Sequence, residues 1–400
     1  MKIPSLQLLP QYFTNTNIAT FILVVMMTQF DFFEGSEVSL FKVGIMLLTP
    51  LVFFIKVPFL SKGFFWGILY ISSISIVAFL HSYIRFSTIG FLAMYIFTSI
   101  VFYNLVYANA FTLEYFIKLL KYIIFAYTIC LICQQMFILI GIKFMPLINL
   151  NHQHFLSIDK LPSLSVEPSH TARILTAVMF GYLKCSEYKQ GTSIKIRQLF
   201  STDHKWVTIA FFWTMLTMGS GTAFVGIGIL SLYFINWKNA IYIVPLFLTL
   251  FTILIQVENK QLNRVVNLAE AITTNNIQSI KSSEGSGASR IVPIINTFTT
   301  LDLSNKKTWI GIGTTTIEHN TTGWRRNDTI ISSIEQYGLL TYLLSLVLIF
   351  QCFIRKILSI ETLFFILLLG CSLISIYYVW GILMLFTTIK YFEQNQKSNE

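Results

Sequence analysis

Residues 164–173 read LSVEPSHTAR, and this short stretch concentrates side chains that can ionise or form hydrogen bonds. A carboxylate or an imidazole can take a proton from a substrate hydroxyl. A guanidinium offers a planar fork of donors that matches the oxygens of a phosphate. The stretch therefore has the residue types needed to move a proton beside an anion, and we take three as candidate catalytic residues: Glu167, His170 and Arg173.

The order of these residues predicts the start of a helix. Pro168 disfavours a helical residue before it and suits a first helical turn. Glu167 then lies near the positive end of the helix, and His170 and Arg173, three residues apart, share one face. A capped helix with snorkelling polar residues is the alternative interpretation. However, an arginine carried to the centre of a membrane costs at least about 2.5 kcal/mol, which capping alone does not require.

A second polar group precedes the apolar run that begins near residue 334. Arg325 and Arg326 stand just before Asn327, where an Asn-Asp pair predicts a capped helix start. Two arginines beside a helix N-terminus form a strong anion site, so we expect these three residues to bind a substrate diphosphate. The alternative is a solvated basic patch near lipid headgroups. Arg290 is a further catalytic candidate, and His319 is a weaker one.

Two other motifs have plainer interpretations. In MGSGTAF (218–224), small residues favour a tight turn or close helix packing over phosphate binding, since no lysine follows them. Cys130 and Cys133 form a CxxC spacing inside an apolar run, where buried thiols behave as small hydrophobic groups.

The composition determines which class of fold must position these residues. Hydrophobic residues make up 54% of the 400 and charged residues only 12%, about half the share in a soluble domain. Continuous apolar runs predict an all-α polytopic membrane protein, not a β-barrel. We expect one membrane domain over 1–400 with about twelve helices, near 18–33, 40–55, 63–80, 89–108, 121–141, 171–184, 206–218, 222–235, 239–256, 334–354, 359–373 and 375–389. The last two come from one long run, which we divide near IYYVWG, where aromatic residues suit a membrane interface.

Lysine and arginine in the short loops predict the orientation. Every basic short loop is even-numbered, so those loops and both termini are expected in the cytoplasm; the net charge of +10 then reflects topology, and no nucleic-acid partner is expected. Loops 142–170 and 257–333 fall on the opposite, extracytoplasmic side. The basic loop residues are Lys56, Lys62, Lys118, Lys121, Lys238, Arg355, Lys356 and those of KCSEYKQGTSIKIRQLFSTDHK.

Three local features resemble the O-antigen polymerases and the related O-antigen ligases, which are bacterial inner-membrane glycosyltransferases. They are EPSHTAR near mid-chain, GSGTAF two helices later, and SRIVPI, WIGIG and RRNDTIISSIEQYGLL towards the end. The resemblance implies transfer of a glycan from undecaprenyl diphosphate, without metal or cofactor. It also implies the bacterial cytoplasmic membrane as location, with a flippase and a chain-length regulator as partners.

The same resemblance leaves alternatives. Ligases tend to have histidine before the asparagine, where this chain has Arg326, and this difference favours a polymerase over a ligase, although His319 could substitute in space. A non-enzymatic flippase or transporter of lipid-linked oligosaccharide is the third interpretation. Transporters often show internal repeats and polar residues near the midplane, whereas here the polar residues concentrate in the expected outer loops.

Overall fold

A computed structural model describes residues 14–28, 43–49, 62–81, 86–142, 160–235, 301–313 and 330–399, apart from the single positions 45, 332, 355, 370, 372 and 375. Within these ranges the regular structure is entirely helical. Four helical stretches are long and apolar enough to cross a membrane: Lys62–Leu80, Thr88–Tyr107, Leu113–Leu139 and Ser333–Phe353. The helical fold predicted from the continuous apolar runs is therefore confirmed for the described residues, and it is that expected of a helical membrane protein.

The helices follow one another along the chain with short connections. They are α1 (Asn15–Met27), α3 (Lys62–Leu80), α4 (Phe86–Tyr107), α5 (Leu113–Leu139), α6 (Pro168–Gln190), α7 (Lys205–Thr217), α8 (Gly221–Ser231), α13 (Lys306–Ile310), α14 (Ser333–Leu348), α15 (Ile360–Leu368) and α16 (Tyr377–Asn399). Two 3₁₀ turns, η2 (Ile196–Phe200) and η3 (Leu232–Phe234), and one π-helical turn, η4 (Ile349–Phe353), complete the set.

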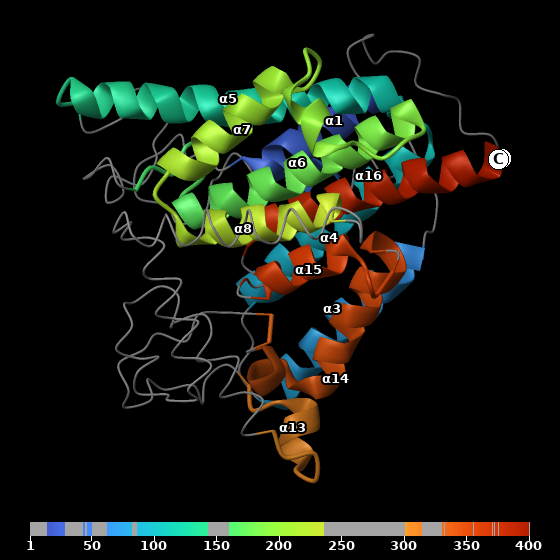
Figure 1. The fold of residues 1–400 in the computed structure, drawn as a ribbon. Coiled ribbons are helices and arrows are strands. Elements are labelled where there is room, and N and C mark those ends of the chain that lie inside the picture. Colours follow the sequence, from blue (N-terminus) through green and yellow to red (C-terminus); the bar gives the residue numbers. More distant parts are fainter. Residues whose placement is uncertain are drawn as a thin grey trace.

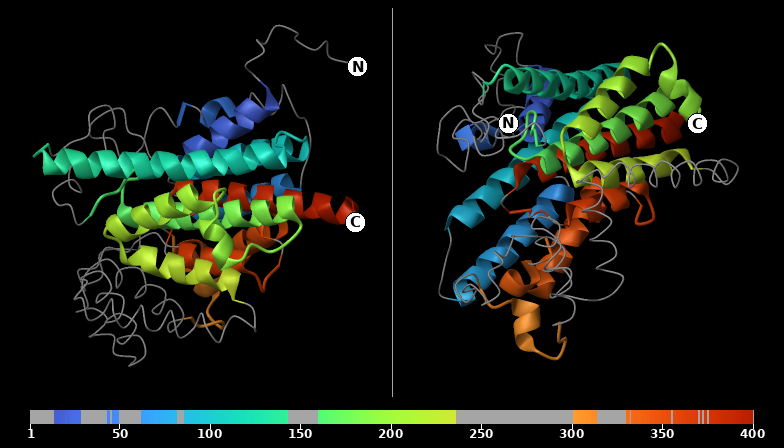
Figure 2. Two further views of the ribbon diagram at one scale, coloured as in Figure 1. Left: turned by 45° about the horizontal axis from the view of Figure 1, so that its top comes forward. Right: turned by 60° about the vertical axis from the view of Figure 1, so that its left-hand side comes forward.

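Helix α6 lies at the centre of this arrangement. Figure 1 shows α5, α6, α7, α8 and α16 side by side along roughly one direction, with α3 and α14 paired below them, and Figure 2 shows the same layering from two other sides. Of the 23 residues of α6, 17 are buried. A helix buried on all sides belongs to the interior of a bundle, so α6 can carry polar residues that a lipid-facing helix would not.

Small residues bring the neighbours of α6 close. A Cβ added to Gly226 of α8 would lie 2.3 Å from Oγ1 of Thr176, and one added to Gly181 would lie 3.0 Å from a methyl group of Leu385 in α16. Interfaces between membrane helices are enriched in small residues for this reason.

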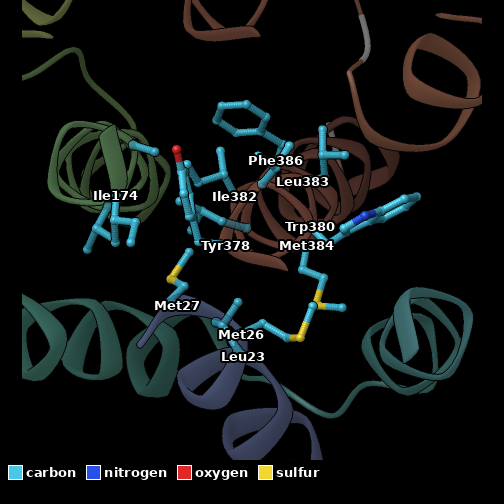
Figure 3. Packing of buried hydrophobic residues seen from close by; sticks show 14 of the residues in the cluster. Leu23, Met26, Met27, Ile174, Tyr378, Trp380, Ile382, Leu383, Met384 and Phe386 are labelled. Atoms are coloured by element: carbon cyan, nitrogen blue, oxygen red, sulfur yellow. The ribbon is translucent and has the colours of Figure 1, made fainter. Parts of the chain in front are cut away.

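The apolar core joins the first and last helices to α6. Figure 3 shows Tyr378 of α16 lying among Ile174 of α6 and Met27 of α1. Tyr378 and Trp380 are 0% and 1% exposed. We had interpreted the aromatic residues of this stretch as interfacial, and for these two residues that interpretation is wrong. The chain does divide there, because α15 ends at Leu368 and α16 begins at Tyr377.

Helix α14 is interrupted at Gly338, which has φ 87° and ψ 159°. The amide of Ile312 donates to the carbonyl of Glu335 at 2.9 Å, and the amide of Gly313 donates to that of Gln336 at 3.1 Å. Gly311, with φ 80°, packs directly on this break. Non-helical backbone within an apolar helix is tolerated where protein covers it, and here the chain around Gly311 does so.

Some expected boundaries are wrong. Helix α5 begins at Leu113, capped by Thr112, so Lys118 and Lys121 lie within a helix and not in a loop. Helix α6 begins at Pro168 and extends past the expected end at 184 to Gln190, where Gly191 ends it in a left-handed conformation. Helix α14 begins at Ser333 after a turn at Ile330 and Ile331, so Asn327 does not cap it.

Candidate functional site

The site begins where the chain enters α6. Glu167 is the N-cap residue in an extended conformation (φ −131°, ψ 147°), and Pro168 occupies the first turn, as the sequence predicts. The Glu167 carboxylate therefore stands at the end of the helix where backbone amides point outwards and negative charge is favoured.

Glu167, Ser169 and His170 form one polar group at this helix end. The hydroxyl of Ser169 donates to Oε2 of Glu167 at 3.0 Å, and Nε2 of His170 lies 3.9 Å from the same oxygen. The Glu167 side chain is 40% exposed and the His170 side chain is 15% exposed. A carboxylate and an imidazole that share one oxygen and reach the surface can accept a proton from an incoming hydroxyl.

Arg173 lies one turn deeper and is only 4% exposed. Its Nη1 donates to the hydroxyl of Tyr378 at 3.0 Å. Among the described residues its Nε has no hydrogen-bond partner, and no carboxylate forms an ion pair with it. A buried donor without a partner costs about 1–3 kcal/mol, and more when the group is charged. The guanidinium is thus a buried positive charge with an unused donor.

Tyr378 connects the members of this group, and it was not predicted from the sequence. Besides accepting from Arg173, its hydroxyl lies 2.9 Å from Sγ of Cys371. Its ring centroid lies 4.6 Å from that of His170. The only signal in the sequence is the phenol itself within the apolar run ISIYYVWG, since a buried tyrosine hydroxyl usually needs a partner.

The chain that leads into α6 is held by α5 and α7. The side-chain amide of Gln134 donates to the Ser163 carbonyl at 3.0 Å and accepts from the Ser163 amide at 2.9 Å. The Leu161 amide donates to the carbonyl of Met218 at 3.1 Å, and Thr171 donates to the Pro162 carbonyl. These bonds fix the position of Glu167 relative to the bundle.

The motif MGSGTAF forms a turn, as predicted. Helix α7 ends at Thr217, Gly219 has a left-handed φ of 72°, and Ser220 is the N-cap of α8. The close contact of Gly226 with Thr176 then seats α8 on α6. The motif therefore serves turn formation and packing, which was the favoured interpretation.

The chain returns to the site at Ile330. Its amide donates to the carbonyl of Cys371 at 3.0 Å, so Ile330 lies beside the residue that contacts Tyr378. The other candidate residues lie outside the described residues: Arg290, His319, Arg325, Arg326 and Asn327. Asn327 precedes Ile330 by three positions in the sequence.

Within the described part of the chain, no three His, Cys, Asp or Glu side chains lie close enough together to hold a metal ion. All five cysteines are free thiols. The chain matches no protein-family model, no curated protein and no solved structure.

Proposed function

We propose that this protein is a polymerase that joins lipid-linked oligosaccharide repeat units at the outer face of a bacterial cytoplasmic membrane. The observation that carries the proposal is the buried Arg173, with its unpartnered Nε, behind an exposed carboxylate and imidazole. Together they offer a proton acceptor next to a positive charge, which is what displacement of a diphosphate by a hydroxyl needs.

The reaction transfers the growing glycan. A hydroxyl oxygen of the incoming unit bonds to the anomeric carbon, and the bond from that carbon to the diphosphate oxygen breaks. Glu167 or His170 takes the hydroxyl proton, and undecaprenyl diphosphate leaves with the electron pair. Arg173 offsets the charge that develops on the leaving diphosphate, because a guanidinium in a buried site acts through little intervening water.

The exposed fraction of the side chains supports this assignment of roles. It falls from Glu167 to His170 to Arg173, so the group is open at the proton acceptors and closed at the guanidinium. Arg290, Arg325, Arg326 and Asn327 complete the diphosphate site in this proposal. The return of the chain at Ile330, bonded to Cys371, supports the inclusion of the last three.

Deletion of the gene tests the proposal against its rivals. Loss of a polymerase leaves glycan with single repeat units and no long chains. Loss of a ligase instead leaves long lipid-linked polymer that never reaches the surface acceptor. Loss of a flippase leaves single lipid-linked units inside the cell. Either of the last two patterns would reject the proposal, and gel analysis of surface and lipid-linked glycan separates all three.

A further inference from the structure

A second surface lies at the opposite end of α6 from Glu167. Helix α6 has 23 residues, and at 1.5 Å per residue it is about 34 Å long, close to the thickness of a bilayer core of about 30 Å. Beyond its end at Gln190 the chain forms η2 and the start of α7. We call residues 195–206 the basic-aromatic segment.

The basic-aromatic segment exposes cations and large apolar side chains together. Phe200 and Trp206 are 63% and 66% exposed. The exposed cations Lys195, Arg197 and Lys205 lie among them, with Asp203 as the one exposed carboxylate of the segment. Lysine and arginine next to exposed aromatic rings are typical of the boundary between lipid and water.

This surface is held in place and is not a loose loop. Ile194, Leu199 and His204 are buried beneath it. Oγ1 of Thr208 donates to the Leu199 carbonyl at 3.1 Å, and Nζ of Lys121 donates to the Asp203 carbonyl at 3.4 Å. The exposed side chains therefore project from a backbone that is fixed before any ligand arrives.

Helix α7 shows which medium faces this surface. Trp206, Ile209, Trp213 and Leu216 are all exposed, and their spacing of three, four and three places them along one face of the helix. An exposed apolar stripe of this kind is lipid-facing in a helical membrane protein. The cations stand at the end of that stripe, at the level of the headgroups.

We propose that the basic-aromatic segment binds anionic phospholipid headgroups. Its six exposed contact residues are Lys195, Ile196, Arg197, Phe200, Lys205 and Trp206. The cations would bind the headgroup phosphates and the apolar side chains would insert among the upper acyl carbons. The proposal is independent of the glycosyl-transfer reaction, because the segment lies at the far end of α6 from Glu167.

The test measures lipid binding to the purified full chain in detergent by native mass spectrometry. The probes are phosphatidylglycerol and phosphatidylcholine with the same acyl chains. Each cation near an anionic surface is worth about fivefold in affinity, so K195Q with R197Q should weaken phosphatidylglycerol binding by about 25-fold. Phosphatidylcholine binding should not change. Exchanging the two cations, K195R with R197K, should preserve binding of the anionic lipid.

A matched control removes two exposed cations elsewhere. Lys306 and Lys307 belong to α13, which Figure 1 places at the opposite edge of the molecule from α7. K306Q with K307Q should leave phosphatidylglycerol binding unchanged. The proposal is overturned if both double variants weaken it equally, or if the natural chain binds the two lipids equally. It is also overturned if inorganic phosphate alone displaces the anionic lipid, since the surface would then be a simple anion site.

Discussion

Arg173 and Tyr378, 205 residues apart in the sequence, meet in the buried centre of the molecule at 3.0 Å, guanidinium to phenol. Because the described residues supply no carboxylate to this guanidinium, the phenol oxygen is its one hydrogen-bond acceptor among them for which the structure gives a distance. The orientation of Arg173, and with it the direction of the charge, depends on Tyr378.

Removing the Tyr378 hydroxyl should therefore affect function without destroying the bundle. Y378F keeps the ring against His170 but leaves another N–H of Arg173 without an acceptor, which should lower the free energy of unfolding by about 1–3 kcal/mol. We expect shorter glycan chains at membrane abundance near that of the natural protein, checked by immunoblot and glycan gel. Y95F is the control, because Tyr95 is a buried tyrosine that stacks on Trp380 of the same helix. Equal effects of the two variants would make the loss one of packing.

Arg173 itself should require its shape as well as its charge. R173A removes the charge and should abolish long chains, whereas R173K retains a charge but offers a compact ammonium in place of a planar fork. Loss of one charge-assisted contact costs about 1.5–3 kcal/mol, or roughly ten- to a hundredfold in rate. Chain length measured at equal abundance decides the question. Normal chains from R173A would remove this residue from the mechanism.

The arginines outside the described residues allow a parallel test. Alanine at a true diphosphate contact among Arg290, Arg325 and Arg326 should abolish long chains, and lysine there should shorten them. Lysine should be silent at an arginine that only anchors the chain near headgroups. Should all three alanine variants make chains of normal length at normal abundance, the site is confined to Glu167, His170 and Arg173.

The interruption of α14 should depend on the absence of a side chain. A Cβ on Gly338 would lie 2.2 Å from the carbonyl oxygen of Trp309, and its backbone angles belong to a region that costs other residues about 1–3 kcal/mol. G338A should therefore reduce membrane abundance and the thermal midpoint. Gly90 of α4 has no atom within 4 Å of the same position, so G90A should be neutral or slightly stabilising. Equal behaviour of the two variants would contradict the observed contact.

His204 should make stability depend on acidity. Burial lowers the pKa of His204 from its ordinary value of 6.5, with a further contribution from Lys121 and opposition from Asp203. A depressed pKa means that the unfolded chain takes up the proton first. Stability is then complete above about pH 6.5 and falls as the pH drops through the lower pKa of the folded protein. The thermal midpoint in detergent should decline in acid, and H204Q, which cannot titrate, should flatten that decline.

Local chemistry could be predicted from the sequence much better than tertiary partners. Pro168 after Glu167 determines a helix start through backbone sterics alone, and the spacing of His170 and Arg173 determines a shared face. Both features are present in the structure. Nothing local distinguishes Tyr378 from an interfacial aromatic residue, because its role arises only when α16 packs on α6. The break at Gly338 was missed for the same reason, since the backbone that satisfies it comes from residues 309–313.

Helix boundaries were missed where charge was taken as a sign of a loop. Lys118 is exposed on the side of α5, and Lys184 pairs with Glu187 within one turn of α6 at 3.0 Å. A helix tolerates such residues near its ends when each side chain reaches water or a partner. The expected boundaries of α5 and α6 therefore fell inside the helices.

The burial of α6 on all sides also has a consequence for biogenesis. A ribosome releases the chain from its N-terminus, so Arg173 is synthesised about 200 residues before the tyrosine that receives its hydrogen bond. Until α16 emerges, the guanidinium has to be kept hydrated or held by the insertion machinery, since a bare charge is not stable among acyl chains. Nascent chains truncated before Tyr377 then become natural substrates for membrane quality control, and the last helix acts as the signal that assembly is complete.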